Sequence, residues 1–294
     1  MRTYPAKVLL FGEHILLRGA AALAAPLHLY GGQWQFGSDS GQQFRLREWV
    51  EYLLQLPCDF RLAAFKDDLE AGLFFQSDIP TGYGLGSSGA LCAAAYERYA
   101  EQPIARHDAS LLPELRNILA AMESFFHGAS SGIDPLVSYL SQPLLLRPDG
   151  ALNAVQVPAL PPGMTLFLLD SRRTRSTGPM VQYFRQRCED PAFETLMRTE
   201  LLDVSDAAVS AWLDHRMEDF SRHFQCISQF QAQHLAPMIP DEVLQIWQEG
   251  NARGAFSLKL CGAGGGGVFL GLAFTPLFEH EGWIGDFPCH VLAV

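Results

Sequence analysis

The 294-residue sequence is poor in charged residues, and especially in positive charge. Charged residues make up 18% of the chain, and 21 Lys and Arg residues face 32 Asp and Glu residues, for a formal net charge of -11. An acidic surface repels phosphate backbones and anionic lipids, which argues against nucleic acid or a membrane as the main partner. To bind a polyanion, such a chain must use local basic groups, backbone N–H groups or a metal ion.

Paired cysteines and long apolar runs are also missing. No apolar run reaches the length of a membrane span, and the first residues lead into a strand-like run without the apolar core of a signal peptide. The cysteines have no Cys-x-x-Cys spacing, so we expect reduced thiols in a cytoplasmic protein instead of a zinc site or disulfide framework. The six are Cys58, Cys92, Cys188, Cys226, Cys261 and Cys289.

Apolar residues, in contrast, make up 48% of the chain, which is enough to form the cores of two domains. A proline-rich stretch at 157–163 is the best linker candidate, so we predict domains at 1–157 and 158–294. Strands are predicted at 7–11, 27–36, 44–46, 144–146, 164–170, 256–260, 268–272 and 289–294. Helices are predicted at 49–56, 89–101 and 109–126, and in three or four pieces over 180–250.

Glycine is concentrated in two loops, and the first of them opens an Ala-rich helix. It contains Gly82, Gly84, Leu85, Gly86, Ser87, Ser88 and Gly89. Glycines let consecutive backbone N–H groups point toward one ligand. The first helical turn adds unpaired N–H groups and the positive end of the helix dipole. The two serine hydroxyls can cap the helix or reach a metal-bound phosphate. We interpret this stretch as a triphosphate-binding loop.

The second glycine loop runs from Gly262 to Gly267 between two predicted strands. Both loops match the spacing Gly-x-Gly-x-x-Gly. A dinucleotide-binding fingerprint, however, needs a strand directly before its first glycine and a helix after its last. The first loop is separated from its strand and the second continues into a strand, which disfavours a nicotinamide or flavin cofactor. Neither loop ends in Lys-Ser/Thr, so a Walker A loop is excluded.

Charged residues stand out in three other places. Glu123 and Asp134 bracket a Gly- and Ser-rich break after a predicted helix, and this break can fold back so that both carboxylates face one cleft. An aspartate before a proline also suits a helix N-cap. Glu13 and His14 lie between apolar runs, where they need a partner, a function or a solvated turn. The basic, hydroxyl-rich loop 171–178 suits either an anionic substrate group or solvent.

Three separated segments, 7–14, 80–90 and 259–267, together resemble the conserved motifs of the GHMP kinase superfamily, which includes galactokinase, homoserine kinase, mevalonate kinase and phosphomevalonate kinase. Within it, the mevalonate kinases are the most similar, because Glu123 to Asp134 matches their Glu…His-Gly…Ser-Gly-x-Asp pattern. The resemblance implies an α+β fold. Its N-terminal half would be like domain 2 of ribosomal protein S5 and its C-terminal half ferredoxin-like.

The resemblance also implies an activity, namely ATP- and Mg²⁺-dependent transfer of the γ-phosphoryl group to an alcohol, with mevalonate as the expected acceptor. It implies Asp134 and Lys7 as catalytic residues and Ser88 and Glu123 as Mg²⁺ ligands. The nucleotide would bind the residues of the first glycine loop. The acceptor would bind His14, Glu13, Arg175, Thr177 and Gly264.

Two alternatives stay open on the same fold. One is a kinase for a sugar or a phosphorylated alcohol, and the other is a non-catalytic ligand sensor. Retention of Lys7, Ser88, Glu123 and Asp134 together argues against the sensor. The partner we expect is a small-molecule alcohol, without nucleic acid or membrane. A homodimer is left open.

Overall fold

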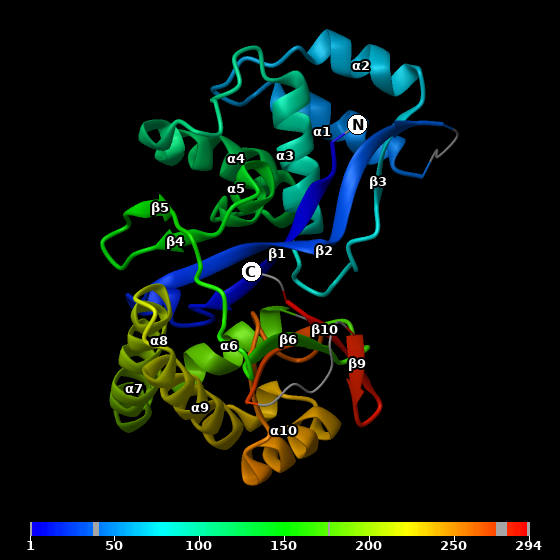
Figure 1. Ribbon diagram of the computed structural model, residues 1–294. Coiled ribbons are helices and arrows are strands. Elements are labelled where there is room, and N and C mark those ends of the chain that lie inside the picture. Colours follow the sequence, from blue (N-terminus) through cyan, green and yellow to red (C-terminus); the bar gives the residue numbers. More distant parts are fainter. Residues whose placement is uncertain (1, 38–40, 176, 275–280, 293–294) are drawn as a thin grey trace.

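The protein is built from two antiparallel sheets with helices packed against them (Figure 1). The computed structural model describes residues 2–37, 41–175, 177–274 and 281–292. In the first sheet the long strand β2 pairs with β1, β3 and β4, and β5 extends the sheet beyond β4. Its strands are β1 (Tyr4–Phe11), β2 (Ala22–Phe36), β3 (Leu73–Ser77), β4 (Leu144–Leu146) and β5 (Leu152–Ala154).

The second sheet has the strand order β7-β8-β6-β10-β9, in which every neighbouring pair is antiparallel. Its strands are β6 (Thr165–Asp170), β7 (Phe256–Leu260), β8 (Val268–Ala273), β9 (Glu281–Ile284) and β10 (Phe287–Val291). The order β7-β8-β6-β10 is that of a ferredoxin-like sheet. This confirms the α+β class predicted for the chain.

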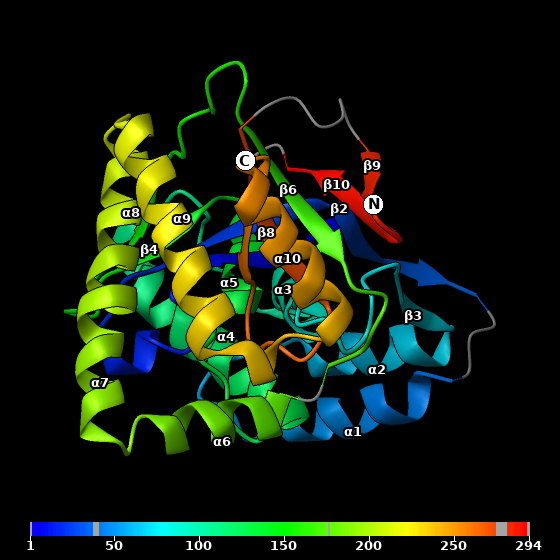
Figure 2. The same cartoon turned by 90° about the horizontal axis from the view of Figure 1, so that it is seen from below.

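Helices of the N-terminal half cover the first sheet, where α3 and α5 pack directly on β1 (Figure 1). In the C-terminal half, α9 and α10 pack against β7 and lie over the second sheet (Figure 2). The helices are α1 (Gln43–Leu53), α2 (Leu62–Glu70), α3 (Ser87–Tyr99), α4 (Leu112–His127), α5 (Ile133–Leu140), α6 (Thr177–Arg187), α7 (Pro191–Met197), α8 (Asp203–Leu213), α9 (Met217–His234) and α10 (Asp241–Arg253). Within the described residues, no helix combines the length and the apolar character needed to cross a lipid bilayer.

Two of the secondary-structure predictions need correction. The strand predicted at 44–46 is wrong, because these residues belong to α1, where Leu46, Trp49, Val50 and Leu53 form one buried stripe at helical spacing. The three or four helices predicted over 180–250 are too few, because the structure has the five helices α6 to α10 there. A π-turn at Arg198–Leu202 joins α7 to α8, so their periodic patterns run together. The other predicted elements are present, most of them with shifted ends, and residues 293–294 of the last predicted strand lie outside the described residues.

The two halves meet through apolar and charged contacts around the end of β1. Phe11 packs edge-on against Trp212, Phe220 and Phe224, which belong to α8 and α9. The segment 155–164 between β5 and β6 contains neither helix nor strand, as expected of the predicted linker. The division into domains 1–157 and 158–294 stays a prediction.

A buried ion pair also joins the halves directly behind Phe11. Lys259 of β7 is 1% exposed and donates to Glu13 Oε1 over 2.7 Å, and to the carbonyl oxygens of Leu10 and Leu260 over 2.9 and 2.7 Å. Gln231 of α9 donates to the same carboxylate oxygen over 2.8 Å. All three ammonium protons thus have acceptors, which offsets the cost of removing the charge from water. The pair fixes the loop after β1 onto the second sheet.

Removing one partner of this pair should destabilise the protein strongly. Glu13→Gln leaves the buried Lys259 charge without its counter-ion, and we expect the free energy of unfolding to fall by about 3–5 kcal/mol. The double variant Glu13→Leu/Lys259→Met should recover much of that loss, because a buried ion pair and an apolar pair have similar stability. Urea unfolding followed by circular dichroism measures both values. A double variant no more stable than either single variant would contradict this account.

Candidate active site

A cavity of about 760 Å³ lies where the first glycine loop, the junction of α4 and α5, and the basic loop before α6 come together. These three segments are far apart in the sequence, but in the fold they line the same cavity. The residues of the cavity wall that were expected to be functional are Lys7, Gly82, Gly84, Leu85, Gly86, Ser87, Ser88, Glu123, Asp134, Arg175 and Thr177.

The glycine loop leads directly into the N-terminus of α3, which we call the mouth of α3. Gly84 and Gly86 have φ angles of 72° and 75°, in the left-handed region that strains any residue with a side chain. The amide of Lys7 donates to the carbonyl of Leu85 over 2.8 Å, which holds the loop against β1. Because α3 begins at Ser87, its first backbone N–H groups have no carbonyl in a preceding turn. The loop therefore presents unpaired donors and a helix dipole, as a phosphate site requires.

Asp134 lies beside this mouth and is paired with a lysine. Its Oδ1 is 2.8 Å from Lys7 Nζ, and the lysine side chain is 9% exposed. Asp134 is the second residue of α5, and Gly132 occupies the N-cap position, so the alternative of a helix cap for Asp134 is wrong. A Cβ on Gly89 would lie 2.8 Å from the backbone of Asp134. The glycine is thus what allows α5 to approach α3 this closely.

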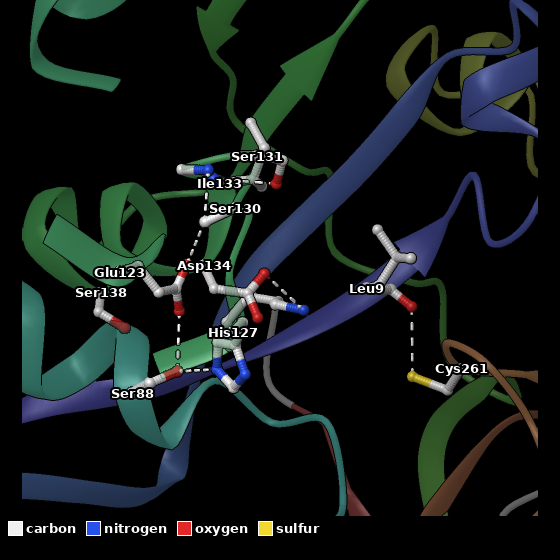
Figure 3. A network of polar contacts seen from close by, with 12 residues as sticks. Leu9, Ser88, Glu123, His127, Ser130, Ser131, Ile133, Asp134, Ser138 and Cys261 are labelled. Atoms are coloured by element: carbon white, nitrogen blue, oxygen red, sulfur yellow. Dashed lines mark hydrogen bonds and ion pairs between the residues drawn. The ribbon is translucent and has the colours of Figure 1, made fainter. Parts of the chain in front are cut away.

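Glu123 faces the same helix mouth from α4. Ser88 donates to its Oε1 over 2.9 Å, and Ser130 donates to Oε2, as Figure 3 shows. Burial, and then the negative charge of Asp134, raise the pKa of Glu123 above its ordinary value. The ionised form is therefore costly in the protein alone, and a cation would relieve that cost.

The donors at this point fit a magnesium ion. Mg²⁺ prefers a few protein oxygens and completes its shell with water and phosphate oxygens. Adjacent oxygens of an octahedron with bonds of 2.0–2.1 Å lie about 2.9 Å apart, and Ser88 Oγ and Glu123 Oε1 are separated by 2.9 Å. In the described part of the chain, no group of three or more His, Cys, Asp or Glu side chains is placed as metal ligands. The donors at this site, a hydroxyl and a carboxylate, are oxygens that suit a hard cation shared with a phosphate.

The guanidinium group of Arg175 lies between the two glycine loops, next to Gly84 and Gly262. A Cβ on Gly84 would lie 1.5 Å from its Nη2, and one on Gly262 would lie 2.2 Å from its Nη1. Burial lowers the pKa of Arg175. Within the described residues, its guanidinium group has no hydrogen bond or ion pair, and its backbone N–H donates to Gly82 over 3.0 Å. A half-buried cation without a counter-ion at a cavity wall is suited to an anion. Ser176, next to it, lies outside the described residues.

Three of the residues expected to bind the acceptor do not line this cavity. His14 stacks on Phe184, and its Nε2 is 3.1 Å from the carbonyl oxygen of Ala263. Burial lowers its pKa to about 4, so it is neutral at pH 7. Glu13 is held by Lys259. A Cβ on Gly264 would lie 2.7 Å from a backbone carbonyl oxygen, so this glycine serves close packing. Their assignment to the acceptor stays a prediction.

His127, Ser130 and Arg45 are among the residues of the cavity wall that were not predicted as functional. His127 and Ser130 contact Ser88 and Glu123, and their place inside the Glu123–Asp134 break could have indicated this. Arg45 also lines the cavity, with its guanidinium carbon 5.5 Å from the ring centre of Phe126. The sequence analysis missed Arg45 because it assigned residues 44–46 to a strand and so did not place Arg45 on a helix that faces the cavity.

Comparison with known proteins agrees with this geometry. Residues 53–142 match the family model for the GHMP kinases N terminal domain. This part of the chain is similar to the N-terminal domain of GHMP kinases. The mevalonate kinase of Pyrococcus horikoshii is 25% identical over 92% of this chain and 87% of its own length. That of Thermococcus onnurineus is 29% identical over 46% of this chain and 47% of its own.

Solved structures show that the GHMP kinase fold extends over nearly the whole chain. The L. major mevalonate kinase in complex with R-mevalonate has a TM-score of 0.65 at 19% identity, covering 93% of this chain and 87% of its own. The Streptococcus pneumoniae phosphomevalonate kinase in complex with phosphomevalonate and AMPPNP has a TM-score of 0.61 at 13% identity, covering 93% of this chain and 92% of its own. At these identities the structures establish the fold alone.

The raised pKa of Glu123 leads to a stability prediction. A carboxyl group whose pKa is raised by folding favours the folded state at low pH, and this advantage is lost as pH rises through the ordinary and the raised value. In EDTA, Glu123→Gln should therefore raise the Tm by a few degrees at pH 7 and leave it nearly unchanged at pH 4. Thermal unfolding followed by circular dichroism tests this. A Tm lowered equally at both pH values would mean that the hydrogen bonds from Ser88 and Ser130 outweigh the buried charge.

Proposed function

We propose that the protein is an ATP- and Mg²⁺-dependent kinase that phosphorylates a small alcohol, with mevalonate as the most suitable acceptor. The observation that carries the proposal is the Lys7–Asp134 pair, 2.8 Å long, at the mouth of a glycine-loop helix that has Ser88 and Glu123 on its other side. Its relatives include mevalonate kinases that align over 92% of this chain. Together these support phosphoryl transfer on a small molecule.

In the proposed reaction, the acceptor hydroxyl lies between Asp134 and the γ-phosphate of ATP. The hydroxyl oxygen forms a bond to the γ-phosphorus, its proton passes to the Asp134 carboxylate, and the bond between that phosphorus and the bridging oxygen of ADP breaks. Lys7 holds the Asp134 carboxylate in place through their ion pair and faces the negative charge that builds on the transferred group. Phosphoryl transfer depends mainly on such positioning and electrostatic stabilisation.

The nucleotide phosphates would bind the backbone N–H groups at the start of α3. Ser88 and Glu123 would hold Mg²⁺, which, when bound, neutralises charge on the phosphate oxygens. Arg45 and Phe126, which also line the cavity, offer an aromatic and cationic surface that suits a nucleobase.

The acceptor end is formed by Arg175 and Thr177, next to the catalytic pair. An unpaired guanidinium group suits a carboxylate such as that of mevalonate, and it suits a phosphate group equally well. For this reason a phosphorylated alcohol is the second candidate acceptor. His14, being neutral, can contribute a hydrogen bond but no charge.

A panel of alcohols with ATP and Mg²⁺ tests the proposal. ADP release, measured with a coupled assay, should be fastest with mevalonate, and omission of Mg²⁺ should abolish it. A higher kcat/KM for phosphomevalonate or for a sugar would keep the kinase and replace the acceptor. Binding of ATP without ADP release from any alcohol would support the non-catalytic sensor and contradict the proposal.

Asp134→Asn should separate catalysis from nucleotide binding. The amide cannot accept the hydroxyl proton, so we expect kcat to fall by about 10²–10⁴-fold. The backbone N–H groups at the mouth of α3 are unchanged, so the Kd for ATP should stay within a few-fold of wild type. Steady-state kinetics and calorimetric titration measure the two quantities. An equal loss of both would show that Asp134 acts by holding α5 in place.

A further inference from the structure

The hydroxyl of Ser88 has two hydrogen-bond partners but only one proton. Its Oγ is 2.9 Å from Glu123 Oε1 and 2.9 Å from His127 Nε2 (Figure 3). A serine hydroxyl donates once and accepts through its lone pairs. In the protein alone, the proton can point to the carboxylate while the imidazole N–H donates to Ser88.

A cation between Ser88 and Glu123 changes this arrangement. The Glu123 oxygen and a Ser88 lone pair would then both point at the metal, so the hydroxyl proton has to point away from it. The other acceptor that the structure places within hydrogen-bond distance of Ser88 Oγ is His127 Nε2. The imidazole would then accept through Nε2 and carry its own proton on Nδ1.

We propose that His127 is a positioning residue for the metal site: it accepts the Ser88 hydroxyl proton and so directs a serine lone pair toward Mg²⁺. This inference rests on the proposed function, because it assumes a metal–nucleotide complex at the mouth of α3. Partners behind a metal ligand commonly orient it, and their loss typically weakens metal binding by 10- to 100-fold.

The position of His127 supports a role in binding over a role in packing. It lies four residues after Glu123 on α4, and side chains at this spacing share one face of a helix. Both therefore face Ser88 at the start of α3. His127 is exposed and lines the cavity wall, so the hydrophobic core does not need its ring.

The decisive experiment replaces His127 by Leu, which removes the acceptor and keeps a side chain of moderate size. Binding of the non-hydrolysable analogue AMPPNP is measured by calorimetry at increasing Mg²⁺ concentration, without any alcohol. We expect the Mg²⁺ concentration at half-maximal binding to rise by about 10- to 100-fold. Affinity for AMPPNP in EDTA should not change, and neither should the Tm.

Two control variants make the result specific. His127→Gln keeps an oxygen acceptor on a flexible side chain and should restore most of the Mg²⁺ affinity. His107→Leu alters an exposed histidine outside the cavity wall and should behave as wild type. An unchanged Mg²⁺ titration for His127→Leu would overturn the inference, and so would a His127→Gln variant as impaired as the Leu variant. If the wild-type protein shows no Mg²⁺-dependent binding of AMPPNP, the proposed function itself fails.

Discussion

Two carboxylates and one lysine at the mouth of α3 form the constraint on which the rest of the site depends. Glu123 and Asp134 come from consecutive helices, and burial, together with the charge of Asp134, raises the pKa of Glu123. Lys7 pairs with Asp134, whereas the partners of the Glu123 carboxylate among the described residues are the hydroxyls of Ser88 and Ser130. Without a bound cation, the buried charge of Glu123 therefore destabilises the site, and binding of a cation would relieve this cost. Such local cost is common where binding depends on a preformed arrangement.

This arrangement depends on how closely α3 and α5 approach each other. Small residues allow it: Ala90, Ala93 and Ala94 of α3 are fully buried, and Gly89 has no room for a side chain beside the backbone of Asp134. A larger residue at Gly89 would push α5, and Asp134 with it, away from Lys7. The Ala-rich character of the helix is thus a requirement of the catalytic pair as well as of the core.

Much of the fold and of the proposed nucleotide site could be predicted from the sequence, because both depend on local patterns. The glycine loop, the helix after it and the two carboxylates flanking a Gly/Ser break are contiguous signals, and the structure brings them to one cavity. The role of Glu13 was harder to predict, because a glutamate between apolar runs can equally well bind a ligand or form a buried ion pair. Its partner Lys259 lies on β7, and only the packing of the two halves brings them together.

The position of Arg175, the proposed acceptor-binding residue, was equally hard to predict, since it depends on contacts between the halves. Arg175 sits between Gly84 of the first glycine loop and Gly262 of the second, so its position depends on how the second sheet docks against the first. Cys261, at the start of that second loop, donates to the carbonyl of Leu9 on β1 over 3.2 Å, a contact that a Ser or Thr hydroxyl could also make. The residues proposed to bind the nucleotide phosphates, in contrast, lie wholly within the N-terminal half. If these assignments hold, changes in the docking of the second sheet would alter the choice of acceptor while leaving the phosphate site intact, which is consistent with one fold serving different functions.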